Sequence, residues 1–487
     1  MPKILQPFKS FFIGLTLLFV FFLTLRTPND PDMWWHLRSG YEMVSRVQIL
    51  TNDIFSYTRF GNAWANVFWL ADIGIYLLYR VGGFLSLSLF VASVATGIMT
   101  VILKHSPGPM LIRLGLLLIA ILSFPAFMSP RPQILTFILL AILDYGLTCY
   151  KKQNRNIPAW LLIPFFILWA NLHGGYFLGF LLLAAVIIGE TLNRLTSPMD
   201  ALAWLKIRQL LGWGSLAWLG TIINPTGLSL WKLPFYTLQV SLGTILEYAS
   251  PNFHRVDMQP ILWLIFLLIV GTGFSKRAID WADLLKFCGF AYMAFVAQRS
   301  IPPFVIVALP IVSRYLAFAW DERLKDTVFH PRPVGNNSHA PSSTNPHGAL
   351  LINTIILLII STFVFKQAIM LTAPQNVFNE LPQKAVSWII ENHPQGRLFN
   401  SYNWGGYLIW TLPQYPVFID GRADLYGDEL MREWSDITTG TDKGLLLLDQ
   451  WQIKIILLES QAPLIPKLSS LGWQQVFKDE KSVIWTR

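Results

Sequence analysis

Residues 29–40 read Asn29-Asp30-Pro31-Asp32-Met33-Trp34-Trp35-His36-Leu37-Arg38-Ser39-Gly40 and directly follow an apolar run at residues 8–25. Asp30 suits a helix N-cap and Pro31 suits the first helical turn. A single apolar face follows from the three- and four-residue spacing of Trp34, Leu37, Tyr41 and Val44. We therefore expect an amphipathic helix on a membrane surface, with tryptophan at headgroup depth. Asp30 and Asp32 either cap this helix and complement its dipole or take part in catalysis.

The composition of the chain indicates a membrane protein. Of its 487 residues, 53% are hydrophobic and 13% are charged, whereas soluble proteins carry about 25% charged residues. The formal charge of +9 comes mostly from Lys and Arg in short loops between apolar segments, where these residues set topology. We therefore expect membrane lipids as partners and no nucleic acid. Cys149 and Cys288 lie in or beside apolar segments, which supports neither a disulfide framework nor a metal cluster.

Eleven apolar runs have about the length needed to cross a bilayer. They are residues 8–25, 84–104, 108–127, 133–149, 158–172, 174–191, 207–223, 259–274, 281–298, 301–318 and 349–365. The first run is followed by no small-residue cleavage pattern, so we interpret it as a retained anchor. The fold class that we predict is an α-helical, multi-pass membrane protein with about 11 transmembrane helices.

The run Val67–Val81 contains Asp72 and Arg80 and either crosses the membrane or lies at its interface. If it does not cross and the N-terminus is cytoplasmic, all the Lys- and Arg-rich loops are cytoplasmic. We therefore predict a half-embedded helix within a first external loop at 26–83, and a cytoplasmic linker at 320–347. The same topology, in a plasma (inner) membrane, places on the outer side the polar segments 29–32, 129–133, 171–175, 224–227, 247–252 and 298–303 and all residues after 365.

The chain after residue 365 has a different composition, with amphipathic stretches and short β-rich runs. We predict strands at 397–399, 417–419, 453–458 and 482–485, and hence a small extracytoplasmic α/β domain at 366–487 that follows a membrane domain at 1–365. Two stretches after predicted strands combine aromatic, glycine and charged residues suited to binding a sugar or peptide acceptor. Their candidate residues are Tyr402, Trp404, Asp420, Arg422 and Asp424. The alternative is a pair of glycine turns with an internal Asp424–Arg422 ion pair.

An anchor helix, an external acidic pair, an interfacial helix, a half-embedded helix and many further spans occur here in the order seen in the GT-C superfamily of membrane glycosyltransferases. The chain resembles a poorly characterised bacterial group of this kind in its Pro-Arg-Pro-Gln, Asn-Leu-His-Gly-Gly-Tyr, Asn-Pro-Thr-Gly and Arg-Ser-Ile-Pro stretches. The resemblance implies a polyprenyl-phosphate sugar donor. It also implies that Asp30 and Asp32, with His36 one turn further, act as catalytic residues, and that the two aspartates bind a divalent cation such as Mg or Mn.

The segment 402–407 is distantly similar to the Trp-Trp-Asp-Tyr-Gly stretch of oligosaccharyltransferases, but it lacks an acidic residue at the corresponding place. Recognition of a peptide sequon is therefore an open question.

The remaining candidates are polar residues at the external ends of apolar runs. Arg131, Arg299 and His173 suit a donor phosphate, although each arginine also suits a headgroup anchor and His173 either a metal ligand or an ordinary helix end. Glu247 is a further acidic candidate for the acceptor site. We predict an enzyme that transfers a sugar from the lipid-linked donor to an extracytoplasmic glycan, lipid or protein. The alternatives are a secondary transporter and a non-catalytic scaffold for envelope glycan assembly.

Overall fold

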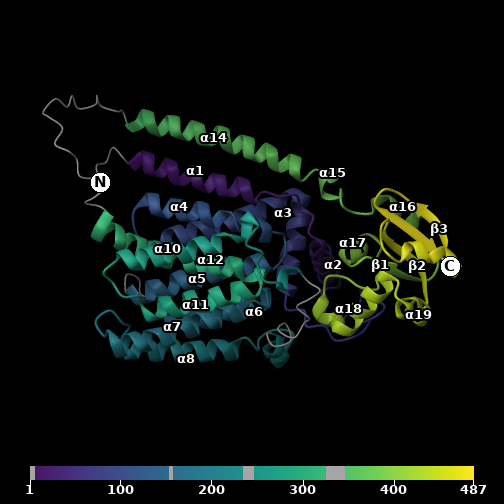
Figure 1. Ribbon diagram of the computed structural model, residues 1–487, viewed down its shortest axis with the longest axis horizontal. Coiled ribbons are helices and arrows are strands. Elements are labelled where there is room, and N and C mark those ends of the chain that lie inside the picture. Colours follow the sequence, from purple (N-terminus) through teal and green to yellow (C-terminus); the bar gives the residue numbers. More distant parts are fainter. Residues whose placement is uncertain (1–5, 153–156, 234–245, 325–345) are drawn as a thin grey trace.

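The long helices lie side by side in a bundle, and a small sheet domain packs against one end of it (Figure 1). The computed structural model describes residues 6–152, 157–233, 246–324 and 346–487. A helix forms over each of the eleven predicted segments. These helices are α1 (Gln6–Thr24), α3 (Trp69–His105), α4 (Met110–Ile121), α5 (Gln133–Lys152), α6 (Leu162–Leu172), α7 (Tyr176–Thr196), α8 (Trp204–Gly220), α10 (Pro260–Phe274), α11 (Trp281–Val296), α12 (Ile301–Ala319) and α14 (Pro346–Leu371).

Five helical stretches among the described residues are long and apolar enough to cross a membrane. They are Trp69–His105, Gln133–Lys152, Tyr176–Thr196, Gln298–Glu322 and Leu350–Leu371. Four further apolar helices are shorter, namely Lys9–Thr24, Met110–Ile121, Ala159–Leu172 and Pro260–Phe274. Several crossings are therefore supported by length and composition, whereas the number eleven stays a prediction.

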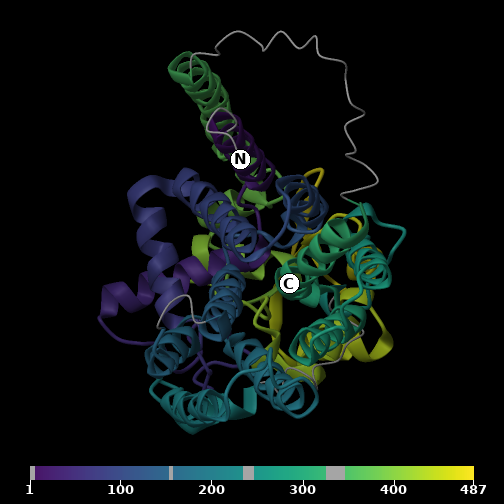
Figure 2. The same ribbon diagram turned by 90° about the vertical axis from the view of Figure 1, so that its left-hand side faces the viewer.

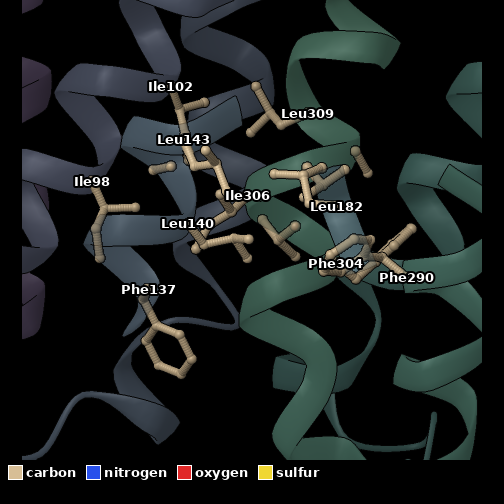
Figure 3. Close-up of a cluster of buried hydrophobic side chains, with 14 of the residues drawn as sticks. Ile98, Ile102, Phe137, Leu140, Leu143, Leu182, Phe290, Phe304, Ile306 and Leu309 are labelled. Carbon is tan, nitrogen blue, oxygen red and sulfur yellow. The ribbon is translucent and has the colours of Figure 1, made fainter. Parts of the chain in front are cut away.

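Helix α12 forms the centre of the bundle, because apolar side chains cover it on all sides. In its most apolar window 83% of the residues are buried. Figure 3 shows how neighbouring helices supply this core. Ile98 and Ile102 come from α3, Phe137, Leu140 and Leu143 from α5, Leu182 from α7, Phe290 from α11, and Phe304, Ile306 and Leu309 from α12 itself.

Helices α1 and α14 form a pair at the edge of the bundle (Figures 1 and 2). Only 11% of the most apolar window of α14 is buried. Its leucines and isoleucines therefore point mostly away from protein, which suits contact with lipid. The helix continues past residue 365 to Leu371, so the sheet domain begins after that residue.

Helix α2 (Pro31–Arg46) and the first part of α3 form the junction between the bundle and the sheet domain. Gly82 and Gly83 have non-helical dihedral angles, and this break separates 69–81 from the rest of α3. The ambiguous run is thus a separate helical segment, although its depth in a membrane stays a prediction. The tryptophans of α2 are not at a lipid surface as expected. Trp34 and Trp35 are at most 4% exposed, because α3 and α17 (Gly405–Thr411) pack against α2.

The sheet domain contains four strands in the order β1-β2-β4-β3. Strand β1 (Arg397–Asn400) is parallel to β2 (Ile453–Glu459), while β4 (Ser482–Thr486) is antiparallel to both β2 and β3 (Gln474–Lys478). The domain's helices are α15 (Pro374–Val377), α16 (Gln383–Asn392), α17, α18 (Ala423–Thr439), α19 (Asp442–Gln450) and α20 (Ile465–Leu468).

Two sequence-based expectations about this part of the chain need correction. The predicted strand 417–419 is wrong, since Val417 forms only an isolated bridge to Ser56 of the first loop. Strand β3 was not predicted, because its five residues are mostly exposed and polar. The predicted linker 320–347 begins with a helical turn at Trp320–Leu324, and residues 325–345 lie outside the described part of the chain.

Candidate active site

The predicted site residues from the bundle lie at the end that carries the sheet domain. Asp30 and Asp32 begin α2, Arg131 precedes α5, His173 lies between α6 and α7, and Arg299 precedes α12. Each of these positions is the end of a helix, where a polar side chain reaches past the apolar bundle. Which side of the membrane this end faces stays a prediction.

Arg131 holds three carboxylates together. Its Nε lies 3.1 Å from Asp30 Oδ2, its Nη1 donates to Asp32 Oδ2 at 2.8 Å, and its Nη2 donates to Glu247 Oε1 at 2.8 Å. We call these four residues the Arg131 cluster. Burial opposes the guanidinium charge, but the nearby carboxylates more than compensate, and the pKa of Arg131 is raised. The structure thus joins two residues predicted for catalysis with one predicted for the phosphate and one for the acceptor.

Asp30 has a capping role in addition to this contact. Its Oδ1 accepts a hydrogen bond from the backbone N–H of Asp32 at 2.9 Å, as expected for a helix N-cap. The capping reading of the sequence therefore holds for Asp30, whose other carboxylate oxygen faces Arg131, and its part in catalysis stays a prediction. A cavity of about 220 Å³ lies beside it and is lined in part by Arg26, Asn29, Ser88 and Ser129.

Asp32 is the carboxylate most closely enclosed by the sheet domain. Its Oδ1 accepts from Trp35 Nε1 at 3.2 Å. A Cβ atom on Gly421 would lie only 1.7 Å from the same oxygen, so the loop before α18 touches this carboxylate. Burial raises the pKa of Asp32 to about 6, against the opposing effect of Arg131. A carboxylate of this pKa is ionised at neutral pH and is a much stronger base than an exposed aspartate.

His36 lies one turn after Asp32 in α2 and pairs with Asp72, a contact that was not predicted from the sequence. Its Nδ1 lies 2.6 Å from Asp72 Oδ1, and both side chains are at most 4% exposed. The imidazole stacks on Trp35 with 3.5 Å between ring centroids. Burial lowers the pKa of His36 well below its usual value. The imidazole thus contacts the indole that donates to Asp32, and a catalytic role for His36 stays a prediction.

His173 is held in one tautomer. Its Nδ1 accepts a hydrogen bond from the backbone N–H of Gly175 at 2.9 Å. The Thr136 hydroxyl, which itself accepts from Trp169 Nε1, lies 2.8 Å from the same nitrogen and donates to it. Burial and the charges of Arg299 and Arg131 lower the pKa of His173 to about 3. The ring is therefore neutral with its proton on Nε2, which makes it a hydrogen-bond donor and unsuited to bind a metal through Nε2.

Arg299 and two tyrosines complete this part of the site. The Arg299 guanidinium lies 4.5 Å from the ring centre of Tyr248, and no carboxylate among the described residues forms a salt bridge with it. Burial raises the pKa of Tyr402, and the charge of Asp32 adds to this effect, which places the phenol near that carboxylate. Tyr248 was not predicted as a site residue. Its position next to Glu247 was the available signal.

The other candidates from the sheet domain have different surroundings. Arg422 is fully buried, where its Nε and Nη2 donate to Asp420 at 2.8 and 2.6 Å and its Nη1 to Asp53 at 2.7 Å. This network links the first loop, through Asp53, to the sheet domain, through Arg422 and Asp420. The predicted Asp424–Arg422 ion pair does not form, since Asp420 and Asp53 take that place. Trp404 is buried in the core shared with α2, whereas Asp424 is exposed.

The predicted metal ligands do not fit a Mg or Mn site in this arrangement. Such ions need several oxygens that converge on one point, at about 2.0–2.6 Å. Both oxygens of Asp30 and of Asp32 accept hydrogen bonds or face the guanidinium instead. Within the described ranges, no group of three or more His, Cys, Asp or Glu side chains is arranged to hold a metal ion.

A second group of charges lies further along α5, away from the Arg131 cluster. Lys286 Nζ lies 3.1 Å from Asp144 and 3.5 Å from Asp283, and these side chains are at most 5% exposed. Arg314 contacts the other oxygen of Asp283 at 2.5 Å, and His105 lies 3.3 Å from Asp144. This Lys286 network connects α3, α5, α11 and α12, and its charges balance if His105 is neutral.

The bundle of apolar helices with a sheet domain at its end is similar in fold to solved glycosyltransferases of the GT-C superfamily. No family model matches the chain, and no curated protein matches it. Solved structures do. The oligosaccharyltransferase AglB from Archaeoglobus fulgidus, in complex with an inhibitory peptide and a dolichol-phosphate, is similar with a TM-score of 0.56 and 11% identity over 93% of this chain and 70% of that chain.

Two further structures agree with this assignment of the fold. The apo form of the Archaeoglobus fulgidus oligosaccharyltransferase has a TM-score of 0.58 and 10% identity, with the same coverage. The arabinofuranosyltransferase AftD from Mycobacteria has a TM-score of 0.51 and 12% identity, over 98% of this chain and 40% of that chain. The expected GT-C resemblance is therefore confirmed at the level of the fold, which by itself does not assign an activity.

Proposed function

We propose that this chain is a membrane glycosyltransferase that transfers a sugar from a polyprenyl-phosphate donor to an acceptor outside the cytoplasm. The observation that carries this proposal is the position of Asp32, a basic carboxylate of pKa about 6, beside Arg131 at the end of a GT-C bundle. The AglB structure with a dolichol-phosphate supports a lipid phosphate as the donor's leaving group.

Arg299 and His173 are the best candidates for the donor phosphate. Arg299 has no salt-bridge partner among the described residues, and His173 offers its Nε2–H as a neutral donor. Both lie at helix ends, where a lipid keeps its chain in the apolar region and its phosphate at the surface. A guanidinium and an N–H donor together neutralise and hydrogen-bond a phosphate without a further group.

The reaction that we propose is a substitution at the anomeric carbon of the donor sugar. An acceptor hydroxyl oxygen forms a bond to this carbon while the bond from the carbon to the phosphate oxygen breaks. The acceptor proton passes to the Asp32 carboxylate, and the bonding electrons leave with the polyprenyl phosphate. Arg299 and His173 stabilise the negative charge that develops on that phosphate.

The acceptor is expected to reach Asp32 from the side of the sheet domain. Tyr402 lies near this carboxylate, and the exposed Asp424 lies near Tyr402. An aromatic ring with a hydroxyl and a carboxylate suits a sugar, because it offers a face for stacking and groups for hydrogen bonds. Glycan, lipid and protein acceptors can each supply the hydroxyl group that attacks the donor sugar.

The test uses purified protein and radiolabelled polyprenyl-phosphate hexose, pentose and aminosugar donors. We expect turnover of at least one donor, and we expect Asp32→Asn to abolish turnover while donor binding persists. Asp257→Asn is the matched control, since this half-buried carboxylate pairs with Arg255 and lies outside the site. Full turnover by Asp32→Asn would refute the assignment of the base. Failure of every donor to bind would favour a transporter or a scaffold.

A further inference from the structure

We propose that Arg131 takes the place of a divalent cation in this site, so that sugar transfer by this chain needs no metal ion. This inference rests on the proposed glycosyl transfer. It departs from the expectation that the aspartates of the first loop bind Mg or Mn, and the reason is the position of the guanidinium between the carboxylates.

The three carboxylates of the cluster come from distant parts of the chain and meet at one cation. Asp30 and Asp32 approach Arg131 from α2, and Glu247 approaches from the segment before α10. The guanidinium lies among all three, with each contact between 2.8 and 3.1 Å. A metal ion at that point would have to displace a side chain that has three ionic partners.

The second oxygens of the aspartates are not free to turn toward a metal. Asp30 Oδ1 holds the start of α2 through the Asp32 N–H, and Asp32 Oδ1 accepts from Trp35 Nε1. Among the described residues, the second oxygen of Glu247 is the one carboxylate oxygen of the cluster with neither a hydrogen-bond donor nor an ionic contact. A divalent cation would find one such oxygen, whereas Mg typically requires about six ligands in octahedral geometry.

A guanidinium in this position can supply the positive charge and the contacts to an anion that a metal ion would otherwise supply. It has five N–H groups. Nη1 and Nη2 each use one N–H for a carboxylate, and the single Nε–H donates to the Ser129 hydroxyl at 3.0 Å while Nε lies 3.1 Å from Asp30 Oδ2. The second N–H of Nη1 and of Nη2 has no partner among the described residues, so two donors remain for a ligand anion. The charge is permanent over the physiological pH range, because an arginine stays protonated in proteins and the three carboxylates favour its charged form.

The experiment measures metal binding to the full chain without any donor. Terbium is the probe, because Trp35 donates to Asp32 at 3.2 Å and will sensitise terbium emission from this site. We expect no sensitised emission from the wild type at micromolar terbium. Arg131→Ala removes the resident cation and leaves three carboxylates, so we expect this variant to bind terbium about 10- to 100-fold more tightly than wild type.

Three variants control this result. Arg131→Lys keeps a cation at this position and should not gain terbium binding. Arg131→Ala combined with Glu247→Gln should lose most of the terbium binding that Arg131→Ala gains. Arg255→Ala removes an exposed arginine that pairs with Asp257 elsewhere and should leave binding as in wild type.

Wild-type protein alone can overturn the proposal, even if Arg131→Ala does not fold. Tight terbium binding by the wild type that Mn displaces and Asp32→Asn abolishes would show that a metal shares the site. A folded Arg131→Ala variant that gains no binding would equally refute the idea. If labelled donor is turned over, addition of a chelator should leave the rate within about twofold, and a complete loss would contradict the inference. Absence of any donor turnover would count against the proposed function and leave the metal-binding result standing.

Discussion

Replacement of Gly421 by alanine tests the geometry of the site with a single methyl group. The new Cβ would lie 1.7 Å from Asp32 Oδ1, whereas real Cβ contacts are essentially never shorter than 3.0 Å. The carboxylate or the loop must therefore move by about 1.3 Å, the difference between these two distances. The loop is fixed by the buried Arg422 network, so we expect Asp32 to move and its contact with Arg131 to weaken.

The expected result of Gly421→Ala is a large loss of rate with a modest loss of stability. A displacement of about 1 Å in a catalytic group costs about 100-fold in rate, and overpacking costs about 1–3 kcal/mol of folding free energy. The assay is single-turnover transfer from a labelled polyprenyl-phosphate sugar, together with thermal unfolding in detergent. Gly74→Ala is the control, because no atom beyond its chain neighbours and the backbone of its own helix lies within 4 Å of the added Cβ. If Gly421→Ala is folded and keeps the wild-type rate, Asp32 is not the base.

Three other predictions concern pH and the two buried ion networks. Because Asp32 must be ionised to accept a proton and its pKa is raised to about 6, kcat/KM should fall as the pH decreases through about 6; an acid limb near 4 would contradict this role. Lys286→Met leaves Asp144 without its lysine partner in the bundle, so we expect the free energy of unfolding to fall by about 3–5 kcal/mol. Thermal or denaturant unfolding measures this change, and an unchanged midpoint would show that the network is dispensable for stability. Arg422→Lys cannot make the two bonds to Asp420, so we expect faster proteolysis between the bundle and the sheet domain; wild-type protection would argue against this network as the tie.

The helices were predictable because each apolar segment is long and bounded by polar or turn residues. The charge distribution also separated 69–81 from the later part of α3, where the chain breaks at Gly82 and Gly83. The environment of α2 was not predictable in the same way. Trp34 and Trp35 fit a membrane surface as well as a protein core, and only the fold shows that α17 covers them.

The residue types of the site could be predicted, but their partners could not. Asp30, Asp32, Arg131 and Glu247 were each candidates for chemistry, yet their sequence positions give no indication that one arginine contacts all three carboxylates. His36 was expected beside the aspartates in catalysis, and its pairing with Asp72, which is 36 residues away, was not predicted. Gly421 belongs to the site because its loop contacts Asp32 of the first loop, almost 400 residues earlier in the chain. Local sequence patterns contain no signal for such a contact.

That contact has a consequence for the way the protein is made. A ribosome completes Asp32 early and Gly421 only after most of the chain has been translated, so the nascent bundle exists for a time with an open acidic loop. Chains that stop before the sheet domain retain all eleven apolar helices but cannot enclose Asp32. Premature termination should therefore leave the acidic first loop uncovered, because covering it requires the last part of the polypeptide to return to the first.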